Sequence, residues 1–349
     1  MRYAVNINLV VNTASTTSKI PFSISLDFSM STKPEGGVVR HEIALINGVH
    51  TKISYAVPHE DNERVCIVVI PGNPGSIEFY DIFIESLFKE SGGKIPVYGV
   101  GHAGHCQLEE AGYFTCGKRN SPEQENSPIT LHLEDQIAHK LSFIAYHIPN
   151  ECKVILIGHS AGAYITLQMM KRYHDKDKFL KGILLFPAIE HIMESPSGRL
   201  WWVVCFYLQW PFLFMTFFFS LMPAVLKKWS IGWWMHLNKQ SSHESTVNAT
   251  HAFLNYRAME NMLRIGRDLG SIKDIDMQSV SDNIDKLIFY YGARDPWVPR
   301  SCYEKMKKLF PDGDIKICND DIQHAFVLNG SEEIAKKVWG WLDKEFTVV

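Results

Sequence analysis

A serine between two glycines, in the stretch Gly158-His159-Ser160-Ala161-Gly162, is the strongest sign of chemistry in this chain. The apolar run 154–157 predicts a strand before it, and a helical pattern follows over 163–172. A strand, a G-x-S-x-G turn and a helix in this order hold a serine hydroxyl exposed at a strained elbow. The glycines let the turn close and the helix approach the strand without Cβ clashes. We predict that Ser160 is a nucleophile; the alternative is an ordinary glycine-bounded turn.

An orienting carboxylate is expected further along the chain. A serine hydroxyl needs a base to accept its proton and a third group to orient that base, and in this type of chain the order is Ser, then Asp or Glu, then His. The strand-like run 286–291 leads into a turn that contains Asp295, Pro296 and Pro299. We predict that Asp295 is the carboxylate; the alternative is a plain turn aspartate. Four other acids fit less well. Asp282 and Asp285 precede the strand, and Asp320 and Asp321 lie too close to the candidate base.

His324 is the predicted base. It follows a short apolar strand, 315–318, and precedes a closing helix over 332–344, so it stands in the expected position of the order. The alternative is a structural or solvent-exposed histidine. With Ser160 and Asp295 it would form a triad that requires no cofactor.

His102 and His105, with Cys106, Glu109 and Glu110 close behind, are the residues that could suggest a metal site. The glycines at 101 and 104 disfavour a helix there, so the spacing does not place these groups on one face. We therefore predict no metal.

Two backbone N–H groups are predicted to stabilise a developing oxyanion. The N–H of Ala161 lies at the start of the helix after the elbow, beside the hydroxyl. The strand 65–70 leads into the loop Pro71-Gly72-Asn73-Pro74-Gly75, and a helix is expected over 78–89. Because Pro74 has no N–H, Asn73 or a nearby glycine must be the second donor, and we favour Asn73.

The motifs together resemble those of the lipid droplet-associated hydrolases, from about residue 45 to the C-terminus. The shared segments are Pro71-Gly72-Asn73-Pro74-Gly75, Gly101-His102-Ala103-Gly104-His105, Gly158-His159-Ser160-Ala161-Gly162, Leu185-Phe186-Pro187, Glu194-Ser195-Pro196, Tyr290-Tyr291-Gly292, Asp295-Pro296-Trp297 and His324-Ala325-Phe326. The resemblance implies an α/β-hydrolase fold, a triad of Ser160, Asp295 and His324, attachment to cytoplasmic lipid droplets, and hydrolysis of sterol esters or other lipid esters.

Length and composition restrict the class of protein. A chain of 349 residues holds one large α/β domain with an insertion. The net charge is −3 and no long basic run is present, which argues against nucleic-acid binding. Seven cysteines without framework spacing indicate reduced thiols in a cytosolic protein. Residues 1–40 are expected to be a poorly ordered extension, with a targeting segment as the alternative, and residues 107–128 a surface loop.

Residues 200–226 form an apolar, aromatic stretch without a charged side chain. Its length would allow a membrane span, but one crossing would separate Ser160 from Asp295 and His324. Pro211 and Pro223 disfavour a single straight helix. We predict attachment to droplets and endoplasmic reticulum from the cytosolic face without crossing; the alternative is a buried lid. The side chains predicted to contact lipid are Trp201, Trp202, Phe206, Trp210, Phe214, Phe218, Trp233 and Trp234.

Alternating strands and helices predict an α/β fold with a mostly parallel sheet covered by helices on both faces. The predicted organisation is an extension (1–40), the first part of the core (41–193), an apolar cap or membrane-associating insertion (194–281) and the second part of the core (282–349). Within the insertion, residues 252–269 are expected to form one amphipathic helix.

The leading functional hypothesis is a serine lipid-ester hydrolase whose partners are a neutral lipid and the droplet or membrane surface. A membrane-bound acyltransferase or thioesterase would use the same three residues, so the sequence leaves both open. A different hypothesis is a protein that organises droplets and has weak or no hydrolase activity.

Overall fold

The apolar runs of the sequence form buried strands of one sheet. The computed structural model describes residues 38–59, 64–105, 131–237 and 244–346. In β3, every residue after Val65 is buried, as expected for a strand covered by helices on both sides. The strands are β1 (Arg40–Ile46), β2 (Val49–Ala56), β3 (Val65–Ile70), β4 (Val97–Val100), β5 (Lys153–His159), β6 (Phe179–Leu185), β7 (Leu287–Gly292) and β8 (Asp314–Cys318).

The eight-stranded sheet has the order β1-β2-β4-β3-β5-β6-β7-β8. β1 and β2 are antiparallel to each other, and β2 is antiparallel to β4, whereas all the later neighbours are parallel. In the register of β3 and β5, Ile70 pairs with Gly158, so the loop after β3 lies beside the turn after β5. The carboxyl ends of parallel strands share one edge, which is where open α/β sheets bind ligands. The mostly parallel α/β fold predicted from the sequence is confirmed.

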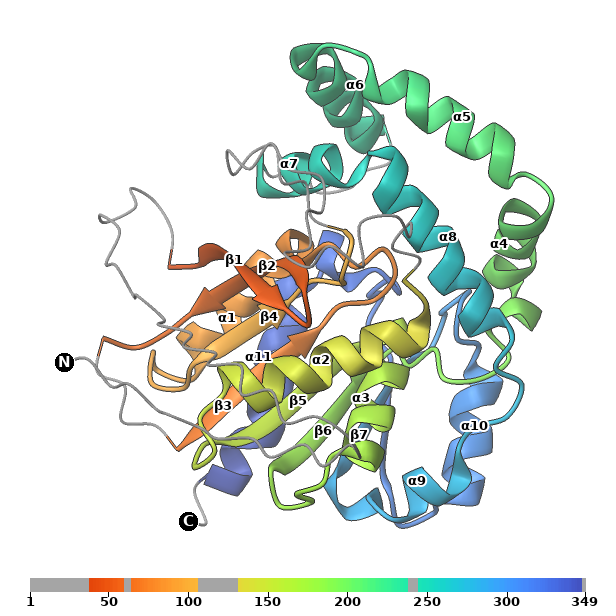
Figure 1. Ribbon diagram of the computed structural model, residues 1–349. Helices are drawn as coiled ribbons and strands as arrows, with labels where there is room; N and C mark the ends of the chain where they lie inside the picture. The colour runs from red at the N-terminus through yellow and green to blue at the C-terminus, as the bar shows by residue number, and fades with distance from the viewer. Residues whose placement is uncertain (1–37, 60–63, 106–130, 238–243, 347–349) are drawn as a thin grey trace, which may run out of the picture. The chain divides into compact units, whose positions relative to one another are not determined.

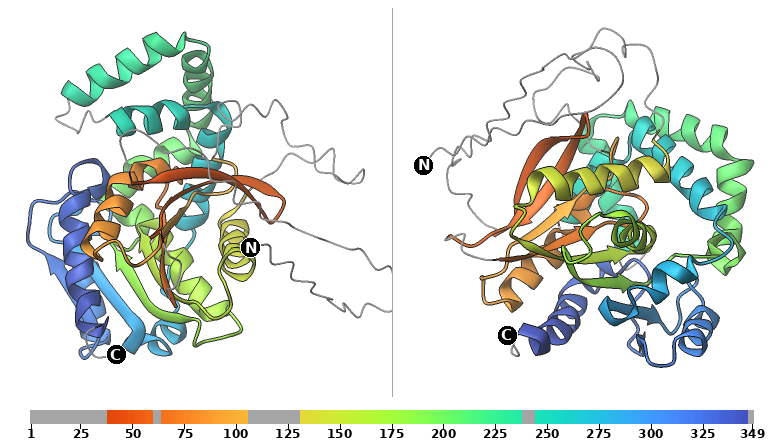
Figure 2. Two further views of the ribbon diagram at one scale, coloured as in Figure 1. Left: turned by 90° about the vertical axis from the view of Figure 1, so that its left-hand side faces the viewer. Right: turned by 60° about the horizontal axis from the view of Figure 1, so that its bottom comes forward.

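Helices cover both faces of this sheet (Figures 1 and 2). One face packs on α2, α3, α9 and α10 through residues such as Ile137, Ile165 and Met306. The other face packs on α1 and α11, through Phe83 and Ile334 among others. These helices are α1 (Asp81–Glu90), α2 (Leu133–His147), α3 (Ala161–Arg172), α9 (Met277–Ser281), α10 (Arg300–Leu309) and α11 (Ser331–Phe346).

Between β6 and β7 the chain leaves the sheet and forms a group of helices beyond its carboxyl edge (Figure 1). We call α4 to α8 the cap: α4 (Pro196–Phe206), α5 (Gln209–Ser220), α6 (Ala224–Leu237), α7 (Glu244–Phe253) and α8 (Tyr256–Gly270). Helix α8 contacts α4 and α5, and Met259, Met262 and Leu263 of α8 are buried with Leu213 of α5. The cap therefore has a small apolar core of its own.

Two helix boundaries in the cap differ from expectation. Residues 252–269 form parts of two helices, because the Asn255 side chain caps a new helix by accepting the N–H of Ala258. Pro211 does not break the aromatic stretch. It lies in the first turn of α5, where its missing N–H costs no intrahelical hydrogen bond. The break comes earlier, at Tyr207 and Leu208.

Among the described helices, none has by itself the length and apolar composition needed to cross a membrane. Helices α4 and α5 together have the required length and apolar composition, but the two helices are bent by 80° relative to each other. The predictions for the extension up to residue 37 and for the loop 107–128 concern residues outside the described part of the chain.

Candidate active site

Ser160 occupies a sharp turn between β5 and α3. Its backbone has φ 52° and ψ −116°, a conformation that costs free energy for any residue with a side chain and persists only where the surrounding structure holds it. The Ser160 N–H donates to the carbonyl of Leu185 at 2.9 Å, and its carbonyl accepts the N–H of Ala188 at 3.2 Å. A Cβ atom on Gly162 would lie 2.2 Å from the Ile70 carbonyl oxygen, so only glycine allows α3 to approach the end of β3.

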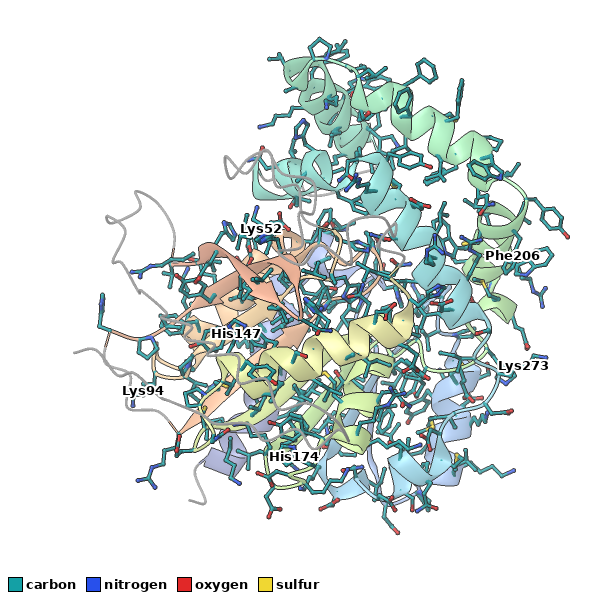
Figure 3. All side chains as sticks on the ribbon, viewed as in Figure 1. Lys52, Lys94, His147, His174, Phe206 and Lys273 are labelled. Carbon is teal, nitrogen blue, oxygen red and sulfur yellow. The ribbon has the colours of Figure 1, made fainter. Side chains whose placement is uncertain are left out.

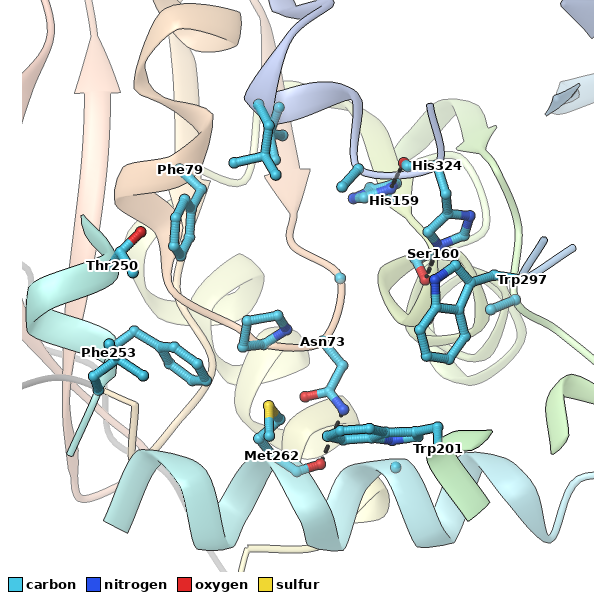
Figure 4. Close-up of a pocket in the computed structure, with 18 of the residues that line it drawn as sticks. Asn73, Phe79, His159, Ser160, Trp201, Thr250, Phe253, Met262, Trp297 and His324 are labelled. Atoms are coloured by element: carbon cyan, nitrogen blue, oxygen red, sulfur yellow. Dashed lines mark hydrogen bonds between the residues drawn. The ribbon is translucent and has the colours of Figure 1, made fainter. Parts of the chain in front are cut away.

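The three residues predicted to form a triad are joined by hydrogen bonds. Ser160 Oγ lies 2.9 Å from Nε2 of His324, and Nδ1 of His324 lies 2.7 Å from Oδ2 of Asp295 (Figure 4 for the first bond). These residues come from the turn after β5, the turn after β7 and the loop after β8. The three segments meet because all three strands end at the same edge of the sheet.

Asp295 is held in place on both of its oxygens. Its side chain is only 1% exposed, while Oδ1 accepts the N–H groups of Trp297 at 2.8 Å and Val298 at 3.0 Å. Oδ2 is thus left to face His324. The rejected acids lie elsewhere: Asp321 is exposed and pairs with Arg294, and Asp320 pairs with Lys337.

The two predicted oxyanion donors belong to the helix that begins after Ser160 and to the loop after β3. Ala161 is the first residue of α3, and a helix leaves its first N–H groups without intrahelical partners. Asn73 lines the same cavity as Ser160, and its side-chain Nδ2 donates to the Met262 carbonyl at 2.9 Å. That bond ties the loop to α8 of the cap (Figure 4). The roles of both N–H groups stay predictions.

A cavity of about 800 Å³ extends from the hydroxyl into the cap. Ser160, His324 and Trp297 line it at the sheet, and side chains of α4 to α8 line the part within the cap, among them Trp201, Phe253 and Met262 (Figure 4). Trp233 and Trp234 of α6 line it as well and are more than half exposed, so the cavity reaches the outer side of the cap. The lining suits a ligand with a long apolar chain.

His102 and His105 are buried beside this site with their ring centroids 5.7 Å apart. Burial lowers the pKa of His105 to about 3 and that of His102 well below its usual range. Within the described ranges, no group of three or more His, Cys, Asp or Glu side chains could hold a metal ion. Cys106, Glu109 and Glu110 lie outside those ranges.

Tyr80 and His159 have contacts at this site that were not predicted. His159 lies inside the elbow motif, and Tyr80 ends the short 3₁₀ helix η1 (Ile77–Tyr80), where no sequence pattern marks it. His159 Nδ1 lies 2.6 Å from the Tyr80 hydroxyl, and His159 Nε2 lies 2.8 Å from the backbone carbonyl of His324. Both side chains are buried.

Most of the side chains predicted to contact lipid point outward from the cap. Exposed fractions reach 69% for Trp210, 64% for Phe214 and 51% for Phe218. Phe206 also points away from the protein (Figure 3). Trp201 differs, because it turns inward: it lines the cavity, and a Cβ on Gly266 of α8 would lie 2.6 Å from its indole nitrogen. Trp201 therefore faces the cavity and α8, which differs from the prediction that it contacts lipid.

The fold places the chain in a known class. A thermophilic esterase from Thermogutta terrifontis superposes with a TM-score of 0.53 at 13% identity, covering 87% of this chain and 98% of the esterase. A carboxylesterase from Nitrososphaera gargenis superposes with a TM-score of 0.57 at 14% identity, covering 89% of this chain and all of that one. The fold is that of the α/β-hydrolases.

Sequence comparison narrows the class to a family. Residues 63–327 match the family described as Lipid-droplet associated hydrolase. The lipid droplet-associated hydrolase of Homo sapiens is 32% identical over 311 residues, which are 86% of this chain and 94% of the human protein. That of Gallus gallus is 33% identical over 285 residues, 81% of this chain and 86% of the chicken protein. The chain belongs to the lipid droplet-associated hydrolase family.

Proposed function

We propose that this protein hydrolyses carboxylic esters of lipids with Ser160 as nucleophile, His324 as base and Asp295 as orienting acid. The observation that carries the proposal is the hydrogen-bonded series Asp295–His324–Ser160 at the inner end of an apolar cavity. Ser160 Oγ attacks the ester carbonyl carbon while His324 Nε2 accepts the hydroxyl proton. The N–H groups of Asn73 and Ala161 stabilise the oxyanion.

The remaining steps use the same groups. The tetrahedral intermediate collapses, the C–O bond to the alcohol breaks, and His324 returns the proton to the leaving alkoxide. Water then enters, His324 accepts one of its protons, and the hydroxide adds to the acyl-enzyme carbonyl. The second collapse releases the fatty acid and restores the Ser160 hydroxyl. Asp295 holds the imidazole so that Nε2 faces the serine throughout.

The substrate is a neutral lipid ester, with sterol esters as one candidate class. The cavity is lined mostly by apolar side chains, and its lining includes Trp233 and Trp234 of α6, which are exposed like the other aromatic side chains of the cap. A long acyl chain can thus leave a lipid phase and reach Ser160 without passing through water. The names of the relatives from human and chicken agree with a droplet-bound substrate.

A fluorophosphonate probe should label the full-length protein, with the adduct assigned to Ser160 by mass spectrometry. The labelled protein should have lost its activity, because the probe occupies the nucleophile. A substrate panel then separates the enzyme classes: sterol esters, glycerol esters and acyl-CoA, each with and without an added long-chain alcohol. Faster turnover of acyl-CoA than of either ester indicates a thioesterase, and transfer to the alcohol indicates an acyltransferase. Absence of labelling at Ser160 in folded protein contradicts the proposal.

The cap is proposed to attach the protein to droplets and endoplasmic reticulum from the cytosolic side without crossing. Its exposed aromatic side chains lie on α4, α5 and α6, while the chain before α4 and after α8 returns to the same sheet. Lys227 and Lys228 at α6 supply positive charge next to Trp229, an arrangement suited to a lipid headgroup layer.

Changing Phe214 and Phe218 together to arginine should move much of the protein from droplets to the soluble fraction. Their rings lie 4.5 Å apart on the exposed side of α5. An arginine at the centre of a lipid-embedded helix costs about 2.5–3.5 kcal/mol on insertion scales. Fractionation of cells by flotation measures the effect, while a thermal melt should stay close to that of the parent. Tyr146→Arg, on an exposed aromatic of α2, is the matched control and should leave the distribution unchanged. Retention of the double variant on droplets would show that the cap is not the anchor.

A further inference from the structure

A second series of hydrogen bonds runs behind the proposed triad. The backbone N–H of Gly72 donates to the Tyr80 oxygen at 2.8 Å, and that oxygen lies 2.6 Å from Nδ1 of His159. Nε2 of His159 lies 2.8 Å from the backbone carbonyl of His324 (Figure 4). The series thus joins the loop after β3, the residue before the nucleophile and the residue that bears the base. Tyr80 and His159 are 79 residues apart in the chain, and His159 and His324 are 165 residues apart.

The proton positions along this series follow from the partners. A carbonyl oxygen can only accept, so Nε2 of His159 carries a hydrogen. Burial lowers the pKa of His159 to about 3, and its imidazole is therefore neutral at physiological pH. Nδ1 must then be an acceptor, and the Tyr80 O–H donates to it. Burial also raises the pKa of Tyr80, so the hydroxyl keeps its proton. One arrangement satisfies every group.

The first end of the series lies against the nucleophile. A Cβ on Gly72 would come within 3.0 Å of the Ser160 Cβ and 3.2 Å of His159 Nδ1, so the loop backbone packs directly on the elbow. The next residue is Asn73, whose N–H is the proposed oxyanion donor. Tyr80 therefore holds the residue that precedes this donor.

The other end holds the base. His324 lies in a loop between β8 and η6 (Phe326–Leu328), and its carbonyl is the group that His159 engages. Aromatic rings enclose His159: Phe326 lies at 4.9 Å and Phe186 at 6.2 Å between centroids. Such enclosure excludes water and strengthens the hydrogen bonds inside it.

We propose that Tyr80 and His159 are positioning residues that set the spacing between the oxyanion donor loop, Ser160 and His324. The inference rests on the proposed function, because it assumes that these three groups act on one substrate. Neither residue exchanges a proton with the substrate. Their effect is to hold the three segments, none of which lies in a strand or helix interior, at the distances the reaction requires.

Tyr80→Phe tests this directly, because it removes one oxygen and leaves the ring in its place. We expect the rate of fluorophosphonate labelling and the kcat for a soluble short-chain ester to fall by about 10- to 100-fold, the scale of a small misplacement of reacting groups. KM should stay within about twofold, since the substrate contacts are retained. Tyr291→Phe is the matched control: this tyrosine is also fully buried, and its hydroxyl has no hydrogen-bond partner within the described residues. Its rates should equal those of the parent.

A second pair of variants is available if Tyr80→Phe does not fold. His159→Gln keeps an amide N–H that can reach the His324 carbonyl, whereas His159→Ala has no donor. Labelling of the glutamine variant should be at least about tenfold faster than that of the alanine variant. Equal rates in the two would overturn the proposal.

The outcomes separate this inference from the proposed function. If the parent protein is not labelled at Ser160, the function itself fails. If the parent is labelled and Tyr80→Phe reacts at the same rate, the function stands and the positioning role is wrong. A loss shared equally by Tyr80→Phe and Tyr291→Phe would also overturn it, because it would mean a general effect of buried hydroxyls on packing. A loss that appears in KM rather than kcat would overturn it as well, because it would mean that Tyr80 contributes to substrate binding.

Discussion

Replacing Ser160 with alanine should lower ester turnover by about 10⁶-fold and abolish fluorophosphonate labelling. The Ser160 Oγ is the atom that would bond to the acyl carbon, whereas the elbow itself is held by backbone hydrogen bonds to the Leu185 carbonyl and from the Ala188 N–H, which alanine retains. A residual rate above that in water is expected, since the oxyanion donors and the cavity remain. Initial rates with a soluble ester measure the loss, and a thermal melt checks the fold.

Ser230→Ala provides the control for this variant. Ser230 lines the same cavity from α6, but its Oγ donates to the Lys227 carbonyl rather than meeting a base. Its turnover and labelling should match the parent. Labelling of another serine in folded Ser160→Ala protein would show that the nucleophile is a different residue. Unchanged turnover would show that the reaction does not use Ser160.

The second large effect is expected from substitutions of His324 and Asp295, the other two members of the proposed triad. His324→Ala should cost about as much as the loss of the serine, and Asp295→Asn about 10⁴-fold. The asparagine effect has a specific cause here. The N–H groups of Trp297 and Val298 require an oxygen at the Oδ1 position, so the new NH₂ group must occupy the Oδ2 position opposite His324. A donor there forces the hydrogen of His324 onto Nε2, which then cannot accept the Ser160 proton.

Asp321→Asn is the matched control, because Asp321 is the rejected acid closest to His324 in the sequence and its exposed carboxylate pairs with Arg294. Its activity should be unchanged when measured beside that of Asp295→Asn with one soluble ester. If Asp295→Asn keeps full activity while Asp321→Asn loses it, the orienting acid has been misassigned. Full activity in His324→Ala would instead require another base.

Local patterns were sufficient to predict the strands that carry the candidate catalytic residues. The strand expected over 65–70 is β3 over the same residues, and the elbow motif forms a strand, a turn and a helix around Ser160. These features depend on neighbouring residues alone: an apolar run that suits a covered strand, and glycines where the backbone must approach closely. The order of the motifs along the chain indicated the α/β-hydrolase fold and the family, both of which are confirmed.

The cap was harder to predict because its composition is nearly uniform. In the stretch 200–226 almost every residue is apolar, so no helical period distinguishes the face that packs from the face that is exposed. Trp201 and Trp202 are adjacent, yet Trp201 lines the cavity and Trp202 is exposed. Pro211 suggested a break, but proline is tolerated in the first turn of a helix, and that is where it lies.

By itself the sequence determined the strands β3, β5, β7 and β8, the elbow and the order of the candidate catalytic residues, because each follows from residues within a few positions of one another. Only the tertiary structure decided which residues meet. The distance from Asp295 to His324, the ring of Tyr80 against His159 and the inward turn of Trp201 depend on how strands far apart in the chain pair and on where the cap settles. No local sequence pattern predicts such contacts, because the side chains that meet depend on how all the elements pack on the sheet.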